Sequence, residues 1–162
     1  MIDNGYTFDF ISDKQLLNTR LDHDSLVTEG NSSYRTLLIP SAKYMDHHTL
    51  QHIIRLAEKG ATILFLDNLP VDVPGWHDFK LRKEKMAASL EKLSFDENRT
   101  VLVGRGRIII GNDLDRLFDL AEIIREPMVD DGLLFTRRKS LESVNYFIAN
   151  QTSRKIDQWI AL

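Results

Sequence analysis

The chain has 162 residues, 43% hydrophobic and 28% charged, a length that suits one compact domain, or one domain plus a fragment, with a substantial core. It contains no cysteine, which excludes disulfides, thiolate metal sites and a cysteine nucleophile. The formal charge of −3 gives no electrostatic reason to expect nucleic acid or a membrane as partner, and no apolar run predicts a transmembrane helix or a signal peptide.

The first forty residues predict short elements. Apolar and polar side chains alternate over residues 6–11, which is the pattern of a half-buried strand. A capping box opens a short helix over residues 12–17, and residues 25–28 predict a brief strand. The apolar run 35–39 before Pro40 is typical of a strand buried on both faces of a parallel sheet.

The middle of the chain alternates helix and strand patterns. A helix over 46–59 begins at a capping aspartate, ends at Gly60 and carries one apolar stripe. Residues 61–66 predict a second buried strand, 68–75 a loop and 79–93 an exposed helix.

The next segment predicts a hairpin and a helix. Strands over 100–103 and 107–110 flank a Gly-Arg-Gly turn, in which we attribute both glycines to a need for positive φ. The following helix starts at Asn112 or Asp113 and ends before Pro127.

Beyond Gly132 no helical pattern remains. Residues 133–138, 144–149 and 155–161 predict three antiparallel strands. Because the chain stops at Leu162 directly after the last run, we expect a fragment of a larger protein.

Together these patterns predict an α/β fold of three layers, a mostly parallel sheet with helices on both faces, followed by a short antiparallel segment. We expect an α/β accessory domain over residues 1–132 and the start of a β-sandwich-like domain over 133–162.

Candidate functional residues are sparse. Ser41, Lys43, Asp67 and Asn68 follow predicted parallel strands, at the edge where such sheets bind ligands. No complete catalytic constellation accompanies Asp67, so we assign no catalytic residue.

His48 and His52 have a spacing that could share a metal ion. They lie opposite the apolar stripe, beside Arg55 and Lys59, so we interpret them as part of a solvated face and expect neither a metal nor a cofactor.

Four segments carry a family resemblance. Residues 5–13 (GYTFDFISD) resemble the "GYDFDYIN" opening of the domain that follows the catalytic barrel in bacterial α-L-rhamnosidase-type glycoside hydrolases. Residues 34–63 are similar to that family's "Y-x-x-L-V-L-P" to "G-A-x-V" stretch, residues 104–111 to its "G-x-G-R-V" strand pair, and residues 137–150 to its "H-R-R" to "Y-F-V-A-N" entry into the next β-domain.

The resemblance implies a fold like class I glutamine amidotransferases or flavodoxin, and a periplasmic or secreted parent protein. It places the catalytic carboxylates and metal in the upstream barrel, so no catalytic role transfers to this chain. We therefore expect a non-catalytic accessory domain, whose partners are the upstream catalytic barrel and the downstream β-domain, with carbohydrate as a further partner.

Two alternatives stay open. The chain could be a free-standing flavodoxin-like module that binds a small ligand or sugar through Ser41, Lys43, Asp67 and Asn68. It could also be an independent hydrolase, which would require carboxylates distant in sequence to converge in space.

Overall fold

The computed structural model describes residues 1–140 and 142–161. Its contacts divide the chain into two compact units. The core unit is Ile11–Ile123, and the terminal unit combines Met1–Phe10 with Ile124–Leu162. Our expected domain boundary at Gly132 is not tested by this division and stays a prediction.

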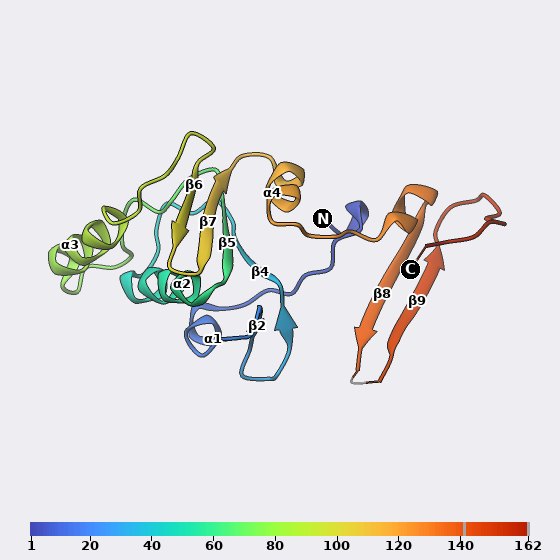
Figure 1. Cartoon of the computed structure of the whole chain (residues 1–162), viewed down its shortest axis with the longest axis horizontal. Coiled ribbons are helices and arrows are strands. Elements are labelled where there is room, and N and C mark those ends of the chain that lie inside the picture. Colours follow the sequence, from blue (N-terminus) through green and yellow to red (C-terminus); the bar gives the residue numbers. More distant parts are fainter. Residues whose placement is uncertain (141, 162) are drawn as a thin grey trace. The chain divides into compact units, whose positions relative to one another are not determined.

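The core unit is built on a four-stranded sheet with the order β4-β5-β7-β6 (Figure 1). β4 (Thr36–Ile39) pairs in parallel with β5 (Thr62–Leu66), and β5 pairs in parallel with β7 (Gly106–Gly111). β6 (Thr100–Val103) adds an antiparallel edge to β7. The sheet is therefore mixed, with parallel strands in one part only.

Helix α2 (His47–Lys59) packs by its apolar stripe against this sheet. The Asp46 carboxylate accepts a hydrogen bond from the His48 amide at 2.8 Å, which satisfies one of the free N–H groups of the first turn. Gly60 ends the helix with a φ of 128°. Both predicted helix boundaries are confirmed, and Ile53 of the stripe is completely buried.

Two further helices accompany the sheet. α4 (Leu114–Leu120) is capped by Asp113, whose carboxylate accepts from two backbone amides, and it contacts β7. α3 (Phe79–Leu90) contacts α2 and buries only Met86, as expected for a helix without a strong apolar stripe.

A small antiparallel sheet lies at the start of the core unit. It contains β1 (Arg20–Asp22), β2 (Ser25–Val27) and β3 (Ser33–Tyr34) in that order. The preceding helix α1 (Asp13–Leu17) has the predicted capping box, in which Ser12 and its partner exchange hydrogen bonds.

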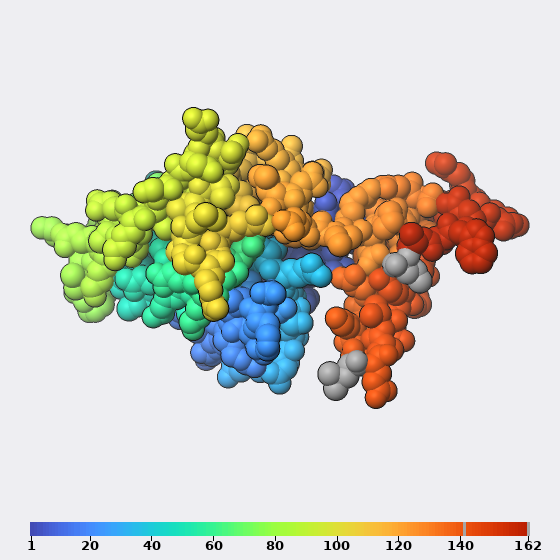
Figure 2. All heavy atoms as spheres, viewed as in Figure 1, coloured from blue at the N-terminus to red at the C-terminus, as the bar shows by residue number. Residues whose placement is uncertain are grey.

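The turn between β6 and β7 shows that its two glycines serve different purposes. Gly104 has a φ of 60°, as predicted, whereas Gly106 has no positive φ. A Cβ on Gly106 would lie 2.4 Å from the Ala57 oxygen and 2.3 Å from the Ala61 oxygen. Figure 2 shows this turn (yellow) directly against α2 (teal). Close packing, and not backbone conformation, therefore requires the second glycine.

The terminal unit contains two short 3₁₀ helices and a hairpin. The helices are η1 (Ile2–Asn4) and η2 (Pro127–Asp131). β8 (Leu133–Lys139) and β9 (Val144–Asn150) pair antiparallel in a continuous register, which confirms two of the three predicted C-terminal strands.

The predicted fold class is wrong. The described residues form three separate small sheets of three, four and two strands, and antiparallel pairings outnumber parallel ones. With four α-helices beside these sheets, this is not the three-layer, mostly parallel fold of flavodoxin-like or amidotransferase-like domains. Apolar runs predict buried strands, but they do not determine how many strands join one sheet.

Two predicted strands do not form. Residues 6–11 are irregular: Tyr6 is buried while Phe10 is 93% exposed, so the alternating pattern covers no sheet face. Residues 155–161 are irregular as well, and Leu141 and Leu162 lie outside the described residues. An extended segment becomes a strand only when a neighbour accepts its backbone hydrogen bonds.

Within the described ranges, no helix is long and apolar enough to cross a bilayer.

Candidate functional site

The carboxyl ends of β4, β5 and β7 meet at one edge of the core unit's sheet. Ser41 and Lys43 follow β4, while Asp67 and Asn68 follow β5, so all four predicted site residues belong to loops at this edge. The Asp67 amide donates to the Gly111 carbonyl at 2.7 Å, which holds the loop after β5 beside the end of β7. Whether these residues bind a ligand stays a prediction.

Arg99 joins this edge from a loop 31 or 32 residues away in sequence. Its guanidinium donates to the Asp67 carbonyl at 2.9 Å and to the Asn68 amide oxygen at 3.5 Å. Asp67 and Arg99 both have positive φ, at 66° and 55°. Sequence reasoning missed Arg99, because a single arginine in a polar loop carries no periodic or motif signal.

Lys43 and Ser41 contribute differently. The Lys43 carbonyl accepts from the amides of Val71 and Asp72, so its backbone anchors the next loop. Its ammonium group lies 5.2 Å from the centroid of the Tyr44 ring. No hydrogen bond or ion pair in the described part of the chain joins the Ser41 or Lys43 side chain to Asp67 or Asn68.

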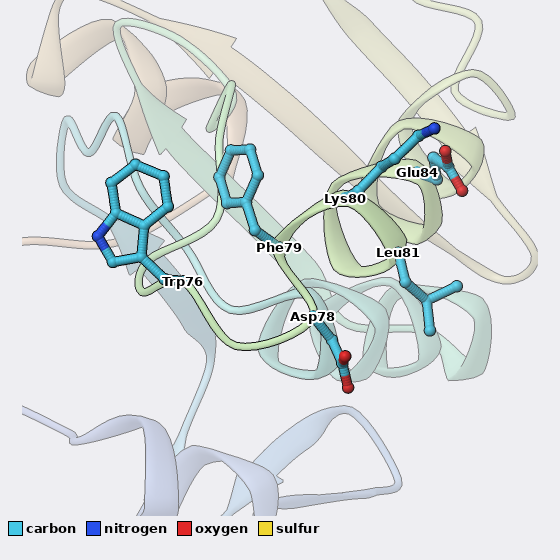
Figure 3. Close-up of a pocket in the computed structure, with 6 residues that line it drawn as sticks. All are labelled: Trp76, Asp78, Phe79, Lys80, Leu81 and Glu84. Atoms are coloured by element: carbon cyan, nitrogen blue, oxygen red, sulfur yellow. The ribbon is translucent and has the colours of Figure 1, made fainter.

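A shallow pocket lies at the start of α3. The Trp76 and Phe79 rings stand 6.0 Å apart with a 45° tilt, and Trp76 is 91% exposed. In Figure 3, Asp78 and Leu81 point away from this aromatic pair. The side chains that line the pocket therefore do not converge on a common point. The lining residues are Trp76, Asp78, Phe79, Lys80, Leu81 and Glu84.

Three consecutive residues at the start of α2, Asp46, His47 and His48, form the tightest group of metal-ligating side chains in the described residues. The two imidazole rings lie 3.8 Å apart between centroids. His47 is only 3% exposed, and neither of its ring nitrogens has a hydrogen-bond partner. Burial lowers the pKa of His47, and the neighbouring His48 lowers it further, which favours the neutral ring.

His52 differs from the expectation of a solvated face. Its Nε2 lies 3.0 Å from the Thr19 carbonyl, to which it donates in the matching tautomer, and the ring is partly buried. Burial lowers the pKa of His52. This hydrogen bond to Thr19, just after α1, gives the His52 ring a structural contact, whereas the His48 ring is exposed.

The terminal unit has its own buried polar cluster. The Glu126 Oε1 atom accepts from Arg137 Nη1 at 2.6 Å and from the Tyr146 hydroxyl at 2.8 Å. The Glu126 amide donates to the Gly5 carbonyl at 2.9 Å. Glu126 is 8% exposed; its carboxylate binds the hairpin, and its backbone amide binds the N-terminal segment.

Comparison with known proteins identifies the family. The family model for glycoside hydrolase 106, described as alpha-L-rhamnosidase, matches residues 1–159. A solved rhamnosidase structure from Novosphingobium sp. PP1Y is similar over 83% of this chain, with a TM-score of 0.65 and 19% sequence identity.

The chain spans 13% of that rhamnosidase's length, and the low identity makes the likeness one of fold. A comparison with curated proteins found no match. Because the family model covers nearly the whole chain, the chain belongs to the alpha-L-rhamnosidase family of glycoside hydrolases.

Proposed function

We propose that this chain is a non-catalytic accessory part of a larger glycoside hydrolase, which supports the catalytic barrel or the assembly of the whole enzyme. One observation carries the proposal: the family match extends over residues 1–159, yet the chain corresponds to 13% of the length of the similar rhamnosidase. A segment of this size has the role of one part in a multidomain protein.

The geometry around Asp67 also supports a non-catalytic role. Glycoside hydrolysis normally requires two carboxyl groups on either side of the scissile bond. In the described residues, the hydrogen bonds of the Asp67 backbone go to Gly111 and Arg99. Asp113 follows β7 at the same edge, but its carboxylate accepts two backbone amides at the start of α4 and caps that helix. This arrangement suits hydrogen bonding more than acid and base catalysis.

The test is hydrolysis of an aryl α-L-rhamnoside by the isolated chain. We expect no release of the aryl group above the uncatalysed rate. Turnover that disappears in Asp67→Asn but persists in Asp119→Asn, an exposed carboxylate of α4, would refute the proposal. Both variants keep the side-chain shape and remove one charge, so they are matched.

The hairpin of the terminal unit is the surface we propose for contact with a further β-domain of the parent protein. Phe147 on β9 is 74% exposed, and Trp159, in the irregular segment after the hairpin, is 101% exposed. A two-stranded hairpin is at best marginally stable alone, and exposed aromatic side chains favour covering by other strands. The matching experiment is a chain truncated after Gly132, which we expect to keep a cooperative unfolding transition. Its loss would show that the hairpin completes the fold of residues 1–132.

Sugar binding at the carboxyl edge is a second candidate, favoured by the position of Arg99. Its guanidinium presents donors next to Asp67 and Asn68, and such groups hydrogen-bond sugar hydroxyls. Titration with L-rhamnose, followed by amide chemical shifts, should move the signals of residues 67–68. Shifts that are absent, or unchanged in Arg99→Ala, would reject this candidate.

A further inference from the structure

The buried imidazole of His47 has no hydrogen-bond partner among the described residues. The ring is 3% exposed, so bulk water does not reach most of it, and both nitrogens lack a hydrogen-bond partner in the described structure. A buried polar group left unpaired destabilises the fold. Buried groups of this kind commonly interact with an ordered water or an ion.

The atoms around His47 are spaced as metal ligands. One carboxylate oxygen of Asp46 and one ring nitrogen each of His47 and His48 lie within 4.8 Å of one another. The Asp46 Oδ1 and His47 Nδ1 atoms are 3.8 Å apart. Two ligands on a tetrahedral zinc ion, at bond lengths of about 2.0–2.1 Å, stand about 3.4 Å from each other. Small side-chain rotations would therefore bring this pair onto a common ion.

We propose that Asp46, His47 and His48 bind one divalent transition-metal ion of the zinc, nickel or cobalt class. Two imidazoles and one carboxylate form a nitrogen-rich ligand set, which these ions prefer, whereas calcium and magnesium prefer oxygen ligands. Water would complete the coordination. The exposed His48 gives the ion a path from solvent to the buried ring.

The fold already fixes part of the site. The Asp46 Oδ1 atom accepts the His48 amide at 2.8 Å, so the carboxylate is held at the start of α2 and keeps a second lone pair on the same atom. The burial of His47 restricts its ring to small rotations. Only the exposed His48 ring must be ordered when the ion binds, which limits the entropy cost.

Nearby positive charge limits the affinity. The Arg82 Nη1 atom lies 3.6 Å from Asp46 Oδ2, and Lys85 also acts on His47. The Arg82 guanidinium also donates to the carbonyls of His77 and Gly75, at 2.8 and 2.9 Å. The positive end of α2 opposes a cation as well. We therefore expect micromolar and not nanomolar affinity.

The site departs from the expectation drawn from the sequence. That expectation concerned His48 with His52, and His52 is bonded to the Thr19 carbonyl. His47 was overlooked because a single histidine at a helix start has no spacing signal. Its burial is a property of the packed structure, in which α2 contacts α3.

Calorimetric titration of the full chain with Zn²⁺, and separately with Ni²⁺, tests the proposal. We expect one saturable site per chain and a rise in melting temperature of about 9 °C at a metal concentration near 100 times Kd. Ca²⁺ should produce neither effect. No saturable binding, or equal binding of Ca²⁺, would overturn the proposal.

Three variants locate the ion. His47→Ala and His48→Ala should each weaken binding at least 10-fold, while His23→Ala, whose exposed ring pairs with Asp22, should leave it unchanged. Since His47→Ala removes a buried ring, the exposed His48 supplies the variant that tests binding without disturbing the core. Undiminished binding in His48→Ala, or a loss in His23→Ala, would contradict the assignment.

Discussion

Replacing Gly106 by alanine should destabilise the core unit strongly, although Gly106 has an ordinary backbone conformation. The added Cβ would lie 2.3 Å from the Ala61 oxygen and 2.4 Å from the Ala57 oxygen. Real Cβ atoms essentially never come within 3.0 Å of such atoms, so the backbone must shift by about 0.7 Å.

That shift would disturb two existing hydrogen bonds. The Ala57 oxygen accepts the Gly60 amide at 2.8 Å, and the Ala61 oxygen accepts the Arg107 amide at 3.2 Å. Overpacking costs about 1–3 kcal/mol, and each weakened hydrogen bond adds about 1 kcal/mol. We therefore expect Gly106→Ala to lower the free energy of unfolding by about 3 kcal/mol.

Thermal unfolding followed by circular dichroism measures this effect, and the melting temperature should fall by about 10 °C. Gly30→Ala is the matched control, because its Cβ would meet only the Thr28 hydroxyl oxygen, at 4.0 Å. That control should stay within about 0.5 kcal/mol of the parent chain. If Gly106→Ala behaved like Gly30→Ala, the close packing of the turn on α2 would be refuted.

Three further measurements address other parts of the chain. Glu126→Ala removes the acceptor that Arg137 and Tyr146 share and should cost about 2 kcal/mol, about 1 kcal/mol for each lost hydrogen bond. A double-mutant cycle of Glu126→Ala with Tyr146→Phe that showed simple additivity would contradict the coupling of these two residues. Because burial lowers the pKa of His52 in the folded chain, the free energy of unfolding should fall as the pH drops below the ordinary pKa of 6.5. Urea titrations at several pH values should show a weaker pH dependence in His52→Gln. An unchanged pH dependence would contradict this role of His52. A chain limited to Ile11–Ile123 should unfold cooperatively in urea, since the sheet, α2 and their shared core lie within it; a broad, non-cooperative transition would show that this unit depends on the rest.

Family membership could be predicted from short sequence motifs. The Gly-Arg-Gly turn and the opening residues 5–13 carried a resemblance that the family match over residues 1–159 supports. The fold implied by that resemblance was wrong, because similar strand and turn motifs occur in sheets of different size and order. Motifs of a few residues identify a lineage more readily than a topology.

Local structure was determined largely by the sequence itself. The capping of α2 by Asp46, its end at Gly60 and the capping box of α1 all involve residues within four positions of one another. The pairing of β4 with β5 follows equally from two apolar runs and the helix between them. These features depend on short-range hydrogen bonds and side-chain periodicity, which a sequence displays directly.

The candidate sites were decided by the tertiary structure. Arg99 donates to the carbonyl of Asp67, which is 32 positions away in the sequence. The ring nitrogens of His47 are buried without a hydrogen-bond partner because α2 packs in the core unit. Residues 6–11 have a strand pattern but no strand partner in the described chain. Burial, pairing and the meeting of distant side chains depend on which surfaces pack together, and that choice is made by the free energy of the whole fold and not by any local pattern.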